Sequence, residues 1–176
     1  HLNFGLDIAL VGERLQAFNS SPASLFFNKI APKTAFIGHS MGGGAAVLAA
    51  KNSSIATTYV GLAPAETNPS AIAAAADVGI PSLIFSGDAD GVTPPAVHHI
   101  PIFNAINADC KAIINIKGGA HCYFANANFN CDLGESTTPG NINISRTTQQ
   151  QIMNTYLGFW MAYFLKVDTS LHAHTK

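Results

Sequence analysis

A serine lies between two glycines in the segment Gly38-His39-Ser40-Met41-Gly42, which has the spacing G-x-S-x-G. The apolar run at residues 34–37 predicts a buried strand before it, and a helix is predicted to begin near Met41. A serine in a tight strand-to-helix turn needs neighbours without side chains, and the two glycines leave that room. A helix N-terminus stabilises developing negative charge, so the Met41 N–H is a candidate oxyanion donor. The pattern predicts a nucleophilic Ser40, although the same glycines are compatible with a turn that serves packing alone.

A serine nucleophile needs a histidine base and a carboxylate that orients the base, because its hydroxyl is weakly nucleophilic at neutral pH. Of the seven histidines, only His121 follows a predicted strand and a glycine pair, in Gly118-Gly119-Ala120-His121. Two acids, Asp88 and Asp90, follow another predicted strand. We favour Asp90 as the orienting carboxylate, since it lies at the tip of the loop before Pro94, and we keep Asp88 as the alternative.

The remaining histidines are expected to be structural. His98-His99 follows two prolines, where a surface or helix-start position is expected, and His39 is expected to shape the turn around Ser40. The segment 88–91 faintly resembles part of a calcium loop, but the further acidic ligands are missing. No H-E-x-x-H or C-x-x-C spacing occurs, so the sequence predicts no metal site, and no cofactor is expected.

The elements that must position these residues alternate between strand-like runs and helical patterns. Strands are predicted at residues 34–37, 57–62, 81–86 and 111–116, and helices at 6–18, 41–52, 71–76, around 102–106 and at 149–165. This alternation predicts an α/β fold with a mostly parallel sheet that helices cover on both faces. The segment between Phe124 and Arg146 has neither period and is predicted to be a loop.

Composition bounds the classes of function. The 176 residues are 48% hydrophobic, and a single domain over residues 1–176 is expected. Nine basic and ten acidic side chains give a net charge of −1, which cannot provide the positive field that nucleic acid needs. The apolar stretch at residues 156–165 is about half of the ~20 residues that span a bilayer, so no membrane span is predicted. Nothing in the sequence indicates the oligomeric state.

Three cysteines, Cys110, Cys122 and Cys131, leave an odd count. Low charge with many Asn, Ser and Thr is typical of an exported protein, so we expect a secreted or periplasmic location, although no signal peptide is visible. The pairing cannot be read from the sequence. A Cys122–Cys131 bridge would close a short loop that holds His121 in place, whereas three buried thiols are the alternative.

Taken together, these segments resemble the α/β-hydrolase branch that contains bacterial cutinase-like polyester hydrolases and their dienelactone-hydrolase and chlorophyllase-like relatives. The resemblance covers about residues 7–166 and depends on the serine turn, the loop from Asp90 to Pro94, and the segment before His121. It implies an α/β-hydrolase fold and a cofactor-free serine esterase. Ser40 would form an acyl-enzyme, His121 would act as base and then acid, and Asp90 would hold the imidazole. An acyltransferase and a catalytically silent binding protein are the alternative functions.

Two features depart from that family. Its polyester hydrolases usually carry a tryptophan just after the proline that follows the second strand here, whereas this chain has Ala65 after Pro64. The family's sheet also has more strands, and its nucleophile lies further along the domain. We therefore expect these residues to be the C-terminal half of the fold, without the N-terminal strands and the second oxyanion donor. Such a piece would leave a sheet edge and apolar surface uncovered.

Overall fold

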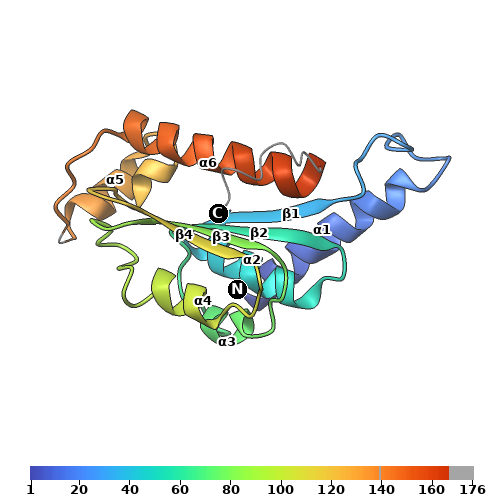
Figure 1. The fold of residues 1–176 in the computed structure, drawn as a ribbon, viewed down its shortest axis with the longest axis horizontal. Helices are drawn as coiled ribbons and strands as arrows, with labels where there is room; N and C mark the ends of the chain where they lie inside the picture. The colour runs from blue at the N-terminus through green and yellow to red at the C-terminus, as the bar shows by residue number, and fades with distance from the viewer. Residues whose placement is uncertain (139, 167–176) are drawn as a thin grey trace.

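The computed structural model describes residues 1–138 and 140–166, and a four-stranded parallel sheet lies at its centre (Figure 1). The strand order is β1-β2-β3-β4, so neighbours in sequence are neighbours in the sheet. The strands are β1 (Thr34–His39), β2 (Ala56–Leu62), β3 (Ser82–Gly87) and β4 (Lys111–Ile116). Because the strands are parallel, all their carboxyl ends lie at one edge, where the loops that carry the candidate residues begin.

Helices cover both faces of the sheet (Figure 1). One face carries α1 (Leu2–Asn19), α2 (Met41–Asn52), α3 (Ala71–Ala75) and α4 (His99–Ala105). The other face carries α6 (Arg146–Lys166), with η1 (Cys122–Phe124) and α5 (Phe129–Ser136) beside one end of it. The connections between successive strands pass through α2, α3 and α4, all on the same face, as crossovers between parallel strands require.

Two apolar clusters hold the layers together, one on each face of the sheet. Successive side chains of a strand point to opposite faces, so neighbouring residues belong to different clusters. On β2, Tyr59 faces the α1–α4 layer and Val60 faces α6; on β3, Ile84 and Phe85 divide in the same way. The indole N–H of Trp160, on α6, donates to Thr58 Oγ1 at 2.8 Å and ties that helix to β2. Both faces of the sheet are therefore buried, which explains why its strands read as continuous apolar runs.

The predicted strands and the alternating α/β order are confirmed. Four of the eight strand ends differ from the prediction, each by one or two residues. The prediction of a loop throughout residues 124–146 is wrong, because α5 forms within it. Its start is capped by Asn128, whose side-chain oxygen accepts from the Cys131 N–H at 3.2 Å. Helix α5 has only eight residues, and its apolar pair Phe129 and Leu133 is exposed, so the segment is too short for its hydrophobic period to predict a helix.

Within residues 1–138 and 140–166, β1 pairs with β2 alone and forms one edge of the sheet. Several large apolar side chains of the neighbouring α1 are exposed, among them Phe4, Leu10 and Val11. None of the described helices combines the length and apolar character that crossing a membrane demands.

Candidate active site

Ser40 occupies the turn between β1 and α2, with φ 57° and ψ −127°. An L-residue rarely adopts positive φ, and strained positions of this kind occur at functional sites. The close approach of Gly38 and Gly42 makes the turn possible, since a Cβ on Gly38 would lie 2.1 Å from the Gly42 carbonyl oxygen. The Ser40 carbonyl accepts from the N–H groups of Gly43, Gly44 and Ala65, so the backbone around it is well held.

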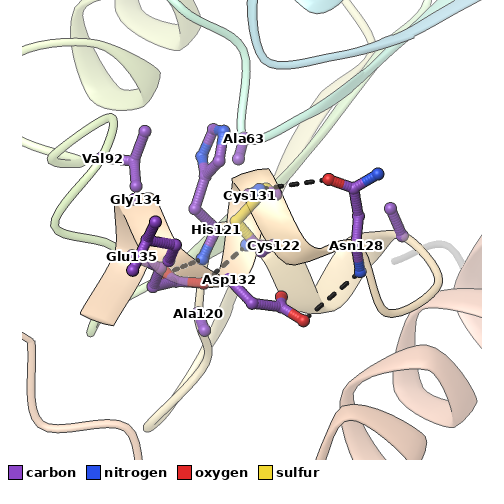
Figure 2. Close-up of a disulfide and its surroundings, with 12 residues drawn as sticks. Ala63, Val92, Ala120, His121, Cys122, Asn128, Cys131, Asp132, Gly134 and Glu135 are labelled. Carbon is purple, nitrogen blue, oxygen red and sulfur yellow. Dashed lines mark hydrogen bonds between the residues drawn. A yellow bond between two sulfur atoms is a disulfide. The ribbon is translucent and has the colours of Figure 1, made fainter. Parts of the chain in front are cut away.

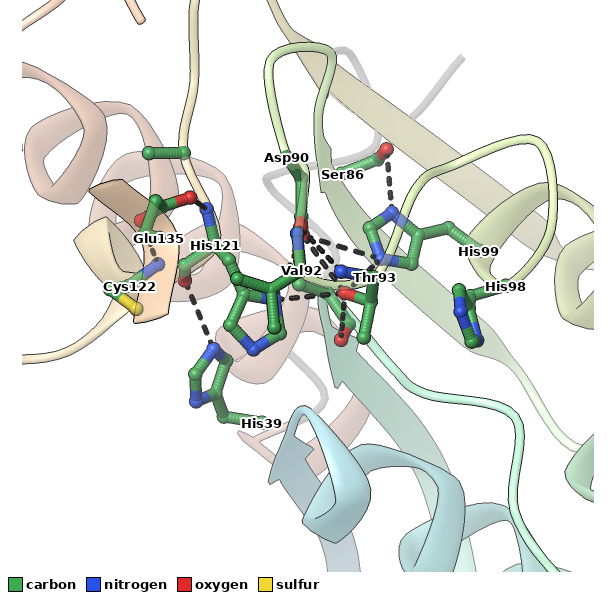
Figure 3. A network of polar contacts seen from close by, with 12 residues as sticks. His39, Ser86, Asp90, Val92, Thr93, His98, His99, His121, Cys122 and Glu135 are labelled. Carbon is green, nitrogen blue, oxygen red and sulfur yellow. Dashed lines mark hydrogen bonds and ion pairs between the residues drawn. The ribbon is translucent and has the colours of Figure 1, made fainter. Parts of the chain in front are cut away.

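Asp90 and His121 are in direct contact across the loops that follow β3 and β4 (Figure 3). The His121 Nδ1–H donates to Asp90 Oδ2 at 2.8 Å, and the two residues are only 2% and 4% exposed, respectively. The Val92 and Thr93 N–H groups donate to Asp90 Oδ1 at 2.9 and 2.7 Å. Burial acts to raise the pKa of Asp90, but hydrogen bonds from His121 and Thr93 outweigh it and hold that pKa below its ordinary value.

His39, the residue before Ser40, connects the serine turn to the Asp90–His121 pair. The imidazole rings of His39 and His121 lie 4.6 Å apart between centroids, and the His39 Nε2–H donates to the His121 carbonyl oxygen at 3.0 Å. Burial lowers the pKa of His39, which favours the neutral ring that packs there. In the described part of the chain, the Ser40 hydroxyl makes no hydrogen bond. The structure thus brings Asp90 and His121 together and places Ser40 next to His39, without a Ser40–His121 hydrogen bond.

The other candidates have distinct surroundings. Asp88 does not contact His121; its Oδ1 accepts from the Gly118 N–H and joins the β3 and β4 loops. Met41 begins α2, where helical geometry leaves the backbone N–H without an intrahelical acceptor, and its side chain is 58% exposed. Val92, on the Asp90 loop, is also exposed. Among residues 1–138 and 140–166, no group of three or more His, Cys, Asp or Glu side chains could hold a metal ion.

Residues that the sequence did not single out complete the surroundings of His121. The Glu135 carboxylate, on α5, accepts from the backbone N–H groups of His121 and Cys122 (Figure 2). Thr93 contacts both Asp90 and His121 through its hydroxyl. His99 begins α4, which confirms the helix-start alternative for the His98-His99 pair, and its side chain is fully buried. The only signal near these residues was the turn sequence Asp88-Ala89-Asp90-Gly91, which precedes Thr93 but does not mark it.

A disulfide joins Cys122, next to His121, to Cys131 on α5 (Figure 2). It closes the short loop considered from the sequence, and the alternative of three buried thiols is wrong. Cys110 is free and exposed. Arg146 strengthens the same region, since its guanidinium donates to the Cys122 and Ala125 carbonyls and pairs with Asp132.

The family model described as PETase, PET hydrolase-like, matches residues 8–171. No curated protein matches the chain. The family match covers nearly all of the sequence, including the serine turn and the Asp90 and His121 loops.

Proposed function

Because the chain belongs to the PET hydrolase-like family and has the α/β-hydrolase fold, we propose that it is a serine carboxylic ester hydrolase acting through an acyl-enzyme. The observation that carries this proposal is the buried Asp90–His121 pair in contact with His39, whose neighbour Ser40 is held at positive φ. These residues come from loops at the carboxyl ends of the parallel strands β1, β3 and β4, where α/β folds place their sites.

In the proposed mechanism, Ser40 Oγ attacks the ester carbonyl carbon while His121 Nε2 takes the hydroxyl proton. The carbonyl π electrons move to oxygen, and the Met41 N–H donates to the oxyanion. The intermediate then expels the alcohol, which receives its proton from His121, and leaves an acyl ester on Ser40. Water repeats the sequence, giving up a proton to His121 before Ser40 leaves protonated. Asp90 holds the imidazole in the tautomer whose Nε2 is free to accept.

The substrates we propose are esters with short to medium acyl groups, with polyesters as a further class to test. The exposed side chains of Met41, next to Ser40 in sequence, and of Val92, on the Asp90 loop, offer aliphatic contacts for an acyl group. Ala65, whose N–H donates to the Ser40 carbonyl, has no ring for stacking on an aromatic acyl unit. Export from the cytoplasm is part of this proposal and is supported by the disulfide, which persists in oxidising compartments.

The direct test is labelling with a fluorophosphonate probe, followed by peptide mapping and an ester panel. Labelling at Ser40, abolished in Ser40→Ala and strongly reduced in His121→Ala, is the expected result. Ser54→Ala is the matched control and should label like the parent. Ser54 is exposed and precedes β2, so it lies at the opposite edge of the sheet from the Ser40 turn. A folded chain that neither labels nor hydrolyses any ester would contradict the proposal and favour a binding role.

A further inference from the structure

A row of buried polar side chains, Thr93, His99 and Ser86, leads from Asp90 to strand β3 (Figure 3). Thr93 Oγ1 lies 2.9 Å from Asp90 Oδ2 and 3.0 Å from His99 Nε2. His99 Nδ1 in turn lies 2.9 Å from Ser86 Oγ, on β3. His99 is 0% exposed and Ser86 is 1% exposed, so each must find its hydrogen-bond partners within the protein. The proposed mechanism gives no role to the side chains of Thr93, His99 and Ser86.

The geometry fixes the direction of the Thr93 hydroxyl. Thr93 Oγ1 also lies 2.8 Å from His121 Nδ1, but that nitrogen donates its proton to Asp90 and offers no lone pair. If the hydroxyl pointed at His99, oxygen lone pairs of Thr93 and Asp90 would face each other at 2.9 Å. The Ala63 carbonyl oxygen is a second acceptor, but it lies at 3.4 Å, so the hydroxyl donates to the Asp90 carboxylate, the nearer and stronger acceptor.

That direction fixes the next two protons. With the Thr93 proton on Asp90, Thr93 Oγ1 accepts, so His99 Nε2 must carry a proton and donate it. Burial lowers the pKa of His99 to about 4, so the ring is neutral near pH 7 and its Nδ1 is an acceptor for the Ser86 hydroxyl. The titratable groups around this ring are Asp90 and His121 in the loops, His98 at the N-cap of α4 and His39 on β1.

We infer that Thr93 and His99 are positioning residues: each hydrogen bond in the series from Ser86 to Asp90 is donated in the direction of Asp90 Oδ2. Ser86 donates to His99, His99 donates to Thr93, and Thr93 donates to Asp90 beside the His121 Nδ1–H. The carboxylate is thereby held in one rotamer, facing His121, and His121 stays in the tautomer that leaves Nε2 free. The catalytic consequence rests on the proposed function, whereas the proton directions do not.

Two matched pairs of variants test the catalytic consequence. Thr93→Val removes the hydroxyl at nearly constant shape, and Thr93→Ser keeps it. His99→Leu removes the Nε2 donor, and His99→Gln keeps an N–H donor within reach of Thr93. We expect kcat of an ester substrate to fall about tenfold in the Val and Leu variants and clearly less in the Ser and Gln variants, with KM little changed.

A double-mutant cycle separates positioning from general loosening. If His99 acts through Asp90, His99→Leu should cost almost nothing further in an Asp90→Ala background, measured as the rate of fluorophosphonate labelling. Equal effects in both backgrounds, or equal losses in the donor-keeping and donor-removing variants, would overturn the inference.

Proton and nitrogen NMR of the histidine rings, in the parent and the variants, gives a measurement that does not depend on activity. The expected result is a neutral His99 with its proton on Nε2 at pH 7, and a downfield His121 Nδ1–H resonance that shifts in Thr93→Val and His99→Leu. A proton on His99 Nδ1, or an unmoved His121 resonance, would overturn the inference. A chain with the expected tautomers that hydrolyses no ester would instead contradict the proposed function and leave the hydrogen-bond directions supported.

Discussion

Asp90 shows how a buried carboxylate is kept ionised. Its two oxygens accept from the Val92 and Thr93 N–H groups, the Thr93 hydroxyl and the His121 ring. Burying an unpaired carboxylate costs far more than any single hydrogen bond returns, so several donors are needed at once. Asp88, two residues earlier, accepts from one donor, the backbone N–H of Gly118, and so links the loops after β3 and β4. The two acids therefore differ in surroundings more than in sequence context.

This difference predicts the effects of two matched substitutions. Asp90→Asn should lower kcat/KM by orders of magnitude, because the amide cannot stabilise the imidazolium and favours the wrong His121 tautomer. Asp88→Asn keeps an oxygen for the Gly118 N–H and should lower kcat/KM by about threefold or less. Steady-state kinetics on one soluble ester compares them. If Asp88→Asn proved the more damaging, the assignment of the acid would be wrong.

The buried His99 also predicts a dependence of stability on pH. The unfolded chain binds a proton on His99 near pH 6.5, but burial lowers the folded pKa to about 4. Between these values the unfolded state holds more protons, so the free energy of unfolding falls as the pH falls. From pH 7 to pH 5 the loss attributable to His99 is about 2 kcal/mol.

Urea denaturation of the parent and of His99→Leu at both pH values checks this, because the variant lacks the one side chain whose protonation is at issue. The parent should lose about 2 kcal/mol more than the variant between pH 7 and pH 5. Equal losses would show that His99 is not held neutral.

Sequence reasoning found residues whose position follows from strand ends, and missed those that act through tertiary contacts. Asp90 and His121 each follow a buried strand and a glycine, a pattern visible in one dimension. The partnership of His99 with Thr93 depends on how α4 packs against the Asp90 loop. Glu135 reaches His121 only because α5 folds back onto that loop. No local pattern encodes either contact.

At the scale of elements, α5 is held by its contacts rather than by an apolar face. Its ties to neighbouring segments are the Cys131 disulfide, the Glu135 carboxylate and the Asp132–Arg146 ion pair. A helix of this length is marginal by itself, so tertiary ties must stabilise it. Its eight residues also give a hydrophobic period too little length to be recognised, whereas α1 has 18 residues and α6 has 21.

Glu135 is expected to matter for both stability and activity. Glu135→Ala leaves the buried His121 and Cys122 N–H groups without acceptors and should lower the free energy of unfolding by about 2–3 kcal/mol. Glu135→Gln keeps one acceptor oxygen and should lose roughly half as much. Thermal unfolding and kcat/KM are to be measured together. Glu13→Gln, on exposed α1, is the control and should match the parent.

At the scale of the whole molecule, the sheet is buried between two helical layers of different make-up. The α1–α4 layer packs through small residues, and a Cβ on Gly5 of α1 would lie 2.8 Å from the Leu48 Cβ of α2. The α6 layer packs through large side chains such as Met153 and Trp160. The alternation of strands and helices along the sequence was sufficient to predict this layering. The assignment of each helix to a face was not predictable, because it depends on how the chain winds.

Trp160 is the chain's single tryptophan and lies at the centre of the α6 layer. Trp160→Ala should lower the free energy of unfolding by about 3–5 kcal/mol, because it opens a cavity and removes the hydrogen bond to Thr58. Trp160→Phe keeps most of the volume and should lose about 1–2 kcal/mol. Urea denaturation followed by circular dichroism measures both. Tyr156→Ala, at an exposed position of the same helix, should change stability by less than about 0.5 kcal/mol.

The Cys122–Cys131 bridge also bears on how the protein withstands proteases. Residues 125–130, which the bridge encloses, are all exposed and are an obvious place for a protease to cut. A single cut there separates the piece with Ser40, Asp90 and His121 from the piece with α5 and α6, yet the two stay covalently joined. The nicked protein should migrate as one species on a non-reducing gel and as two after reduction. With the proposed export, one covalent cross-link would keep the two pieces of a nicked chain together.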